Sequence, residues 1–253
     1  MATVYRDEKK RVNEKKGLKG LRLGVLTSYI NHTLDSTSHH VSTLFHKTLT
    51  SLTTAGVHLT YLTAPPEFHP LNLSRAEVSL YEVQSSFNKY LTSPTHHSCP
   101  SSFQEIYTSG LVDEIAVGPT WHISARQEMS PSNPEYYIRL SRIETLKLLL
   151  AQVFAENKLD GLIFPHQTIL VVRVGESFQA GRNGLSTSLT GAPGGVVPMG
   201  FSSNGDSGDG GMGIPIGMEV VGLWGWDWHV LGIMEEIEVL LKGRRAPVLS
   251  AKE

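Results

Sequence analysis

Two short stretches near the start of the chain alternate apolar and polar residues, and a segment with helical periodicity separates them. Residues 21–26 and 57–61 show the two-residue alternation of strands. Between them, apolar residues recur with the period of a helix that Thr37 or Ser36 would cap and Gly56 would end. A strand, a helix and a strand within about 40 residues predict a parallel crossover unit, and therefore an α/β protein.

The middle of the chain carries two further helical patterns, which a proline-rich stretch separates. Ser74 and Glu77 form a capping-box pattern ahead of the first of these helices. Residues 92–134 contain five prolines, which we expect to break them into loops and short helices. Residues 133–157 then show the clearest long helix, with Pro134 in its first turn.

The last third of the chain predicts a buried strand, a hairpin and a terminal helix. Residues 160–165 are an apolar run between turn formers, which is typical of a fully buried strand. Residues 195–201 and 214–221 are β-like, and we expect the polar stretch between them to form a hairpin loop. At the start of the terminal helix, Trp226 is expected to pack against Leu231 as a hydrophobic staple.

Composition is that of an ordinary globular protein, with 253 residues of which 40% are hydrophobic and 18% charged. A net charge of -2 argues against nucleic acid and against an anionic membrane as partners. The single cysteine, Cys99, excludes an intrachain disulfide and fits a reducing compartment. No apolar stretch approaches the roughly 20 residues of a membrane-spanning helix. We therefore expect a cytoplasmic protein with a charged leader over residues 1–20 and a tail over residues 248–253.

Histidine clusters are the candidate metal ligands, since the chain has 11 histidines. The densest groups are His39, His40 and His46, and His96, His97 and Cys99. Neither group gives the i, i+4 pairing with a glutamate that a zinc hydrolase helix needs. The sequence therefore predicts neither a metal site nor a cofactor.

Candidate binding residues follow the predicted buried strand. His166 comes directly after residues 160–165, and the carboxyl ends of strands in open α/β sheets are where ligands bind. The alternative is a loop histidine that faces solvent. The glycine-rich chain over residues 181–217 permits close backbone approach, so it lines a cleft or forms a tightly turned structural loop.

Four elements of the last third, in order and spacing, resemble the closing section of amidase-signature enzymes. Residues 159–165 resemble that family's strand ending in proline. Residues 190–193 and 197–201 resemble its Thr-Gly-x-Pro and Val-Pro-x-Gly-Phe elements, and residues 214–218 its Leu-Pro-x-Gly strand. The fourth is the closing helix. The first half agrees more loosely, so the resemblance covers nearly the whole chain after Gly20 but only the later half of a family member.

The resemblance implies a mixed sheet flanked by helices, the later portion of the amidase-signature fold, as a partial domain over residues 21–247. It also implies hydrolysis of carbon–nitrogen amide bonds by a serine that a second serine and a lysine activate. Arg182 and Asn183 lie where it implies contact near the substrate cleft, and with His166 they are the predicted substrate-binding residues. The alternatives are an arginine that binds carbonyls and a turn asparagine.

The family's catalytic serines come from a Gly-Gly-Ser-Ser-Gly-Gly type of segment, which these 253 residues do not contain. No serine pair in the sequence has glycine on both sides. We therefore expect no catalytic residue and no activity of the chain alone. A small amide substrate would bind once the missing half is supplied. One alternative is a non-catalytic partner that completes or regulates another polypeptide, by homo- or hetero-association through an exposed apolar face. Another is a truncated product of a complete amidase gene.

Overall fold

The computed structural model describes residues 17–30, 37–93, 100–113, 122–173, 175–176, 179–203 and 213–246. Most of the predicted leader, the tail, most of the hairpin loop and the cluster of His96, His97 and Cys99 lie outside these residues. The predicted domain limits of 21–247 stay a prediction.

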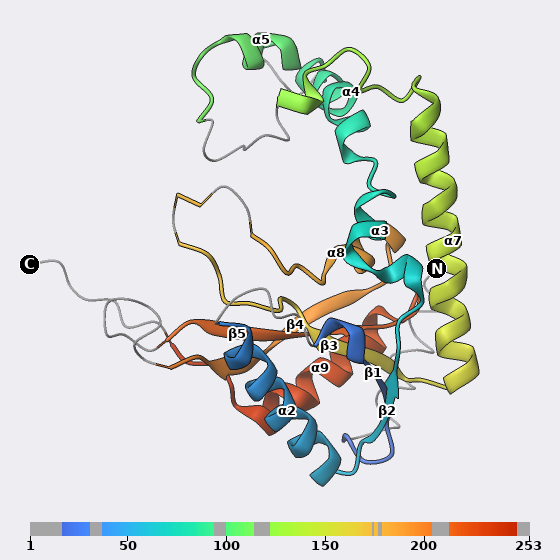
Figure 1. The fold of residues 1–253 in the computed structure, drawn as a ribbon, viewed down its shortest axis with the longest axis vertical. Coiled ribbons are helices and arrows are strands. Elements are labelled where there is room, and N and C mark those ends of the chain that lie inside the picture. The colour runs from blue at the N-terminus through green and yellow to red at the C-terminus, as the bar shows by residue number, and fades with distance from the viewer. Residues whose placement is uncertain are drawn as a thin grey trace, which may run out of the picture.

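A five-stranded mixed sheet lies at the centre of the molecule, in the order β2-β1-β3-β5-β4 (Figure 1). The strands are β1 (Arg22–Leu26), β2 (His58–Leu62), β3 (Gly161–Pro165), β4 (Gly194–Phe201) and β5 (Pro215–Val221). Strand β1 is parallel to β2 and β3, and β5 is antiparallel to β3 and β4. Helix α2 (Ser38–Thr54) connects β1 to β2. The α/β class, the parallel crossover unit and the C-terminal hairpin are thereby confirmed.

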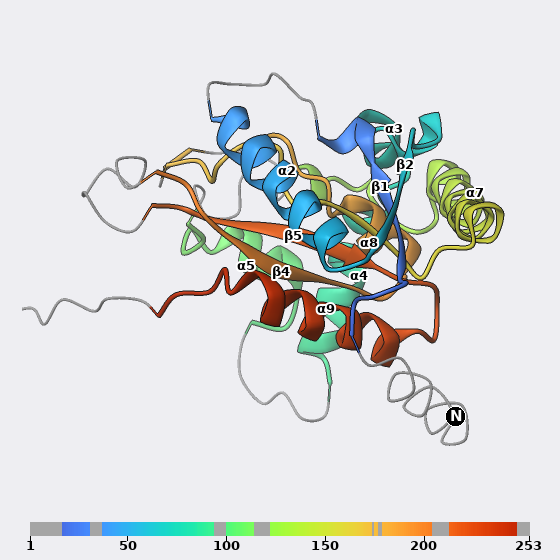
Figure 2. The ribbon, with the colours of Figure 1, turned by 90° about the horizontal axis from the view of Figure 1, so that it is seen from below.

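Helices cover both faces of the sheet. Helices α2 and α9 (Asp227–Leu241) pack on one face, and Figure 2 shows them in front of the strands. Helices α3 (Pro70–Ser74), α7 (Pro134–Asn157) and α8 (Leu185–Thr190) cover the other face. Further helices are α4 (Ser79–Leu91), α5 (Phe103–Thr108) and the 3-10 helices η1 (Thr27–Tyr29) and η2 (Pro66–Phe68).

Strand β3 is buried along its whole length and contributes to both cores. Ile163 packs into the core beneath α2 and α9, while Leu162 and Phe164 pack into the core beneath α7 and α8. Side chains of successive strand residues point to opposite faces, so a strand covered on both faces must be apolar throughout. The prediction of a fully buried strand is confirmed. Because β3 is packed on both faces, the end of this strand is held in place.

Helix α7 begins at the predicted residue. The side chain of Asn133 accepts a hydrogen bond of 2.9 Å from the backbone N–H of Glu135, and Pro134 occupies the first helical position, where it needs no hydrogen-bond acceptor. Because both signals are local in sequence, the helix start could be predicted without knowledge of the tertiary structure.

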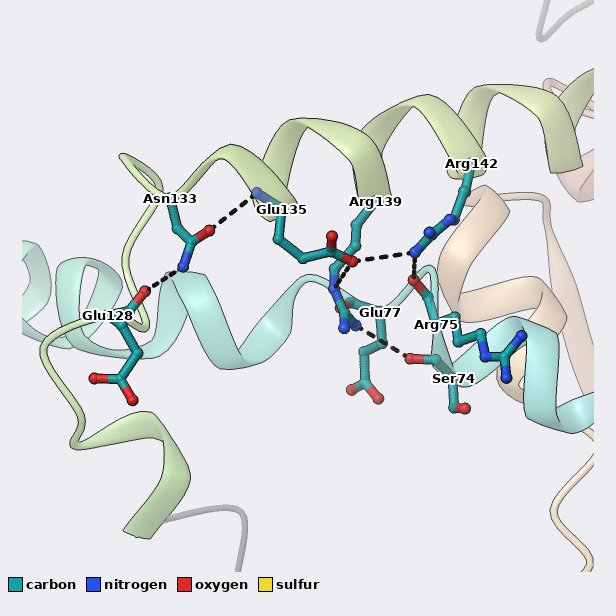
Figure 3. Close-up of polar contacts among 8 residues, drawn as sticks. All are labelled: Ser74, Arg75, Glu77, Glu128, Asn133, Glu135, Arg139 and Arg142. Carbon is teal, nitrogen blue, oxygen red and sulfur yellow. Dashed lines mark hydrogen bonds and ion pairs between the residues drawn. The ribbon is translucent and has the colours of Figure 1, made fainter.

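Two arginines of α7 hold the chain between α3 and α4, as Figure 3 shows. Arg139 Nη1 donates to the carbonyl oxygens of Glu77 at 2.9 Å and Ser74 at 3.3 Å, and Arg142 Nη1 donates to that of Arg75 at 2.7 Å. The predicted capping box of Ser74 and Glu77 is wrong, because Ser74 is the last residue of α3 and α4 begins only at Ser79. Guanidinium groups from a distant helix satisfy carbonyls in this connection, which local sequence does not reveal.

The predicted hydrophobic staple at the start of α9 is also wrong. Leu231 is 51% exposed. Trp226 instead packs edge-on against Phe154 of α7, with ring centroids 5.9 Å apart, and against His229 at 5.2 Å. The indole therefore joins α9 to α7 around the end of the sheet. This tertiary contact removes more of the large apolar ring from water than a contact with the exposed Leu231 would.

Candidate functional site

The three predicted binding residues meet where β3 ends. The backbone N–H of His166 donates to Gly217 at 3.0 Å, and its carbonyl accepts from the N–H of Asn183 at 3.0 Å. A single β-bridge joins Gln167 to Arg182. The glycine-rich segment ahead of α8 thus runs beside the chain that leaves β3, at the carboxyl end of a central strand, where ligands bind in open α/β sheets.

His166 belongs to a row of three polar side chains from three elements. Its Nδ1 atom lies 2.9 Å from Oε2 of Glu219 on β5, and the Thr187 hydroxyl on α8 donates to Oε1 of Glu219 at 2.6 Å. The side chain of Glu219 is 4% exposed, whereas that of His166 is 42% exposed. In a neutral imidazole, an accepting carboxylate at Nδ1 makes Nδ1 the donor and leaves Nε2 as the acceptor.

Gly184 leaves the space in which this row forms. A Cβ atom at position 184 would lie 2.7 Å from Cε1 of His166, closer than real Cβ contacts, and 3.0 Å from Oε2 of Glu219, which is tighter than most of them. The φ angle of Gly184 is -67°, which any residue adopts. Space, and not backbone conformation, therefore demands glycine here.

A cavity of about 210 Å³ adjoins the row. His166 lines it together with apolar residues of α2, β4, β5 and the segment after β3, among them Val41, Ile169, Val196 and Ile216. Gln167 is the other polar side chain of the lining, and a largely apolar cavity with a few placed polar groups is the usual form of a small-molecule site.

Asn183 is 1% exposed and holds two carbonyl oxygens. Its Nδ2 atom donates to Pro165 at 2.8 Å and to Tyr29 at 3.0 Å, and its buried Oδ1 atom has no hydrogen-bond partner in the described part of the chain. Arg182 is exposed on the same segment. This geometry makes Asn183 a clamp between β3 and η1, and the substrate-binding role of Arg182 and Asn183 stays a prediction.

Sequence reasoning missed Glu219, Thr187 and Tyr29. Glu219 is a charged residue inside an otherwise apolar strand, and such residues are rarely buried without a partner, so it carried a signal. Thr187 and Tyr29 carried none, because ordinary helix and loop positions acquire their roles only through tertiary contacts. The Tyr29 hydroxyl donates to the carbonyl of Phe68 at 2.6 Å.

Burial raises the pKa of Tyr29 well above its ordinary value of 10.0, a hydrogen bond with Ser186 opposes this, and the charge of Glu219 adds to it. Above about pH 10 the unfolded chain ionises this phenol while the folded chain keeps it neutral. The contribution of Tyr29 to the free energy of unfolding is therefore complete below about pH 10 and is lost as the pH rises further. We expect the difference in unfolding free energy between wild type and Tyr29→Phe to shrink by about 1.4 kcal/mol from pH 9.5 to pH 11. Urea unfolding at both pH values measures it, and a constant difference would contradict the assignment.

Residues 2–231 match the protein family described as Amidase. The chain is 26% identical over 246 residues to an indoleacetamide hydrolase of Agrobacterium vitis, covering 91% of this chain and 49% of that protein. Its fold is similar to the peptide amidase of Stenotrophomonas maltophilia, with a TM-score of 0.68, 21% identity, and coverage of 93% of this chain and 46% of that one. It is also similar to an amidase family protein of Bacillus anthracis str. Ames, with a TM-score of 0.65, 22% identity, and coverage of 92% and 41%.

The family match covers most of the chain, so this chain belongs to the Amidase family. The resemblance seen in the sequence is confirmed, and so is the mixed sheet with flanking helices, which the solved structures share. The chain spans about half the length of the relatives it matches.

Two negative findings apply to the described residues. None of their helices combines the length and the apolar content that crossing a membrane requires. They also bring no three histidine, cysteine, aspartate or glutamate side chains together as metal ligands, although the rings of His39 and His40 lie 3.8 Å apart.

Proposed function

We propose that this chain forms one wall of an amide-hydrolase cleft and does not hydrolyse amides by itself. The observation that carries this is the Amidase match over residues 2–231 in a sequence without a Gly-Gly-Ser-Ser-Gly-Gly type of segment. The wall is the carboxyl end of β3 with His166, the glycine-rich segment and the adjoining cavity. A small amide is the proposed substrate once the remaining half is supplied. A cytoplasmic location is part of the proposal, which the single cysteine supports.

The order of the polar row supports the lack of activity. A hydroxyl becomes a useful nucleophile when a neighbouring base takes its proton, whether that base is an imidazole or, as the family resemblance implies, a second serine with a lysine. In this chain the Thr187 hydroxyl donates to Glu219, and Glu219 in turn contacts His166. The carboxylate thus separates the hydroxyl from the imidazole, and this is not the geometry of a nucleophile with its base.

The purified chain is expected to leave indole-3-acetamide intact and to remain unlabelled by a fluorophosphonate probe. An amide-bond hydrolysis assay with chromatographic detection of indole-3-acetic acid measures the first, and gel fluorescence measures the second. A complete amidase serves as the positive control and the heat-denatured chain as the blank. Turnover that co-purifies with the folded chain would refute the proposal.

A second candidate function is a partner chain that binds another polypeptide. An apolar stripe on the outer face of α9 favours it: Trp228 is 41% exposed, Leu231 51% and Val239 65%. Leu231 follows Trp228 by three residues and Val239 follows Leu231 by eight, so the three side chains share one side of the helix. Exposed apolar side chains gathered on one side of a helix favour an interaction site, and here the exposed Glu235 lies between Leu231 and Val239.

Association through this stripe is expected to make the sedimentation coefficient depend on concentration, alone or with a partner polypeptide. The double variant Leu231→Lys, Val239→Lys is expected to weaken it at least about tenfold, because a loss of about 1.4 kcal/mol suffices. Leu148→Lys is the matched control, since Leu148 is 73% exposed on α7, which covers the other face of the sheet. A wild type that stays monomeric and binds no apolar dye would count against this function.

A further inference from the structure

We infer that Glu219 is a positioning residue that holds His166 in the tautomer with a bare Nε2 atom, and that the adjoining cavity thereby selects small apolar molecules offering an N–H or O–H donor. This deepens the proposed function, on which it rests, because a primary carboxamide is the simplest such molecule. In this site the protein accepts a hydrogen bond through His166 and the ligand donates it, and Glu219 sets this direction.

The imidazole is held on several sides. Backbone hydrogen bonds of 3.0 Å to Gly217 and Asn183 fix the main chain of His166. Glu219 engages Nδ1 at 2.9 Å, and Gly184 lies against Cε1. The His166 side chain is nevertheless 42% exposed, and the edge of the ring with Nε2 and Cδ2 lies away from the Glu219 contact at Nδ1. Among the described residues, only Glu219 hydrogen-bonds the ring.

Glu219 is itself held so that it cannot turn to a ligand. It lies opposite Phe164 of β3 and Val196 of β4, in the middle of three paired strands. One of its oxygens accepts from Thr187 at 2.6 Å and the other contacts His166. A ligand in the cavity therefore meets the imidazole and not the carboxylate. A buried acceptor on Nδ1 keeps the ring proton there and leaves Nε2 to accept.

The lining of the cavity sets the remaining chemistry of the ligand. Its lining residues include no lysine, arginine, aspartate or glutamate, and the polar side chains among them are His166 and Gln167. An anion would therefore lose its water without gaining a cation, and the carboxylate behind the imidazole would repel it. A neutral molecule with an apolar body therefore fits the cavity, and its N–H or O–H group donates a hydrogen bond to Nε2 of His166.

Ligand-observed NMR titration of the whole chain tests this with matched probes. We expect 2-phenylacetamide, which has N–H donors, to bind about three- to tenfold more tightly than N,N-dimethyl-2-phenylacetamide, which has none, since this is the range that one neutral hydrogen bond supplies. Phenylacetate, the anionic probe, is also expected to bind more weakly than 2-phenylacetamide. Equal affinity for the two amides would overturn the inference.

Glu219→Gln is expected to reverse the selectivity. A glutamine can turn its NH2 group to Nδ1, which moves the ring proton to Nε2 and turns that atom into a donor. The dimethyl amide, whose carbonyl accepts, should then bind at least as tightly as 2-phenylacetamide. The ¹⁵N shifts of the His166 ring report the tautomer directly, and a merely structural role of Glu219 would not move them in this direction. An Nε2–H tautomer in the wild type would overturn the inference.

Three further variants keep the test decisive. His166→Phe should bring the affinity for 2-phenylacetamide down to that for the dimethyl amide, whereas His46→Phe, at an exposed position of α2, should change neither. If Glu219→Gln does not fold, Thr187→Val removes one support of the carboxylate and should reduce the selectivity. Turnover of 2-phenylacetamide would refute the proposed function and leave the selectivity result standing, while absent selectivity would refute only the inference.

Discussion

Phe164→Ala is expected to lower the free energy of unfolding by about 3–5 kcal/mol, the usual cost of removing a buried phenylalanine. Phe164 is 1% exposed on the central strand β3. Its ring lies edge-on to that of Tyr29, with centroids 5.0 Å apart and an interplanar angle of 89°. The truncation removes apolar contacts and leaves a cavity between β3 and the helices above it, which the sheet cannot close without disturbing its hydrogen bonds.

Urea unfolding followed by circular dichroism measures the change, with Phe87→Ala as the matched control. Phe87 is 38% exposed on α4 and packs edge-on against Phe103, with centroids 5.8 Å apart. Its truncation is expected to cost less than half as much, because a smaller part of the ring leaves water on folding. Equal costs for the two variants would show that β3 does not carry the core as described.

Asn183→Ala is expected to lower the free energy of unfolding by about 2–4 kcal/mol. The change removes the donor from the carbonyl oxygens of Pro165 and Tyr29, and each buried polar group left without a partner costs about 1–3 kcal/mol. The loss of the unpaired Oδ1 atom offsets part of this cost. Since Pro165 precedes His166, the variant should also broaden the NMR signals of the His166 ring.

Asn72→Ala is the matched control for this clamp. Asn72 Nδ2 also donates to a carbonyl, that of Pro66 at 2.8 Å, but at an exposed position. Water replaces the lost donor there, so we expect a cost of about 1 kcal/mol or less. A neutral Asn183→Ala variant would remove the case for a structural clamp and strengthen the substrate-binding prediction for this residue.

Local signals accounted for most of the elements. The Asn133 and Pro134 pair marked the start of α7, and the apolar run of residues 160–165 marked the buried strand. The proposed capping box at Ser74 failed because that serine already lies in α3, and Arg139 reaches its carbonyl from α7. A capping box satisfies the backbone N–H groups at a helix start, and α4 starts at Ser79, beyond both residues of the predicted box.

The candidate site was foreseen only in part. His166 could be picked out because it follows a strand end, which is a local property. Its partner Glu219 is 53 residues away and its neighbour Gly184 is 18 residues away, and the distance between side chains across a sheet is not encoded in spacing. Asn183 was expected at a substrate cleft, yet its amide points at two main-chain carbonyls.

By itself, the sequence of this protein determined its α/β class, its strands and longest helix, and its family, because periodicity, caps and motifs are properties of neighbouring residues. Only the tertiary structure decided that His166, Glu219 and Thr187 form one row, that Asn183 joins β3 to η1, and that Trp226 packs on α7. The physical reason is that hydrogen bonds and ring contacts act over a few ångströms, and only the folded chain brings distant residues within that range.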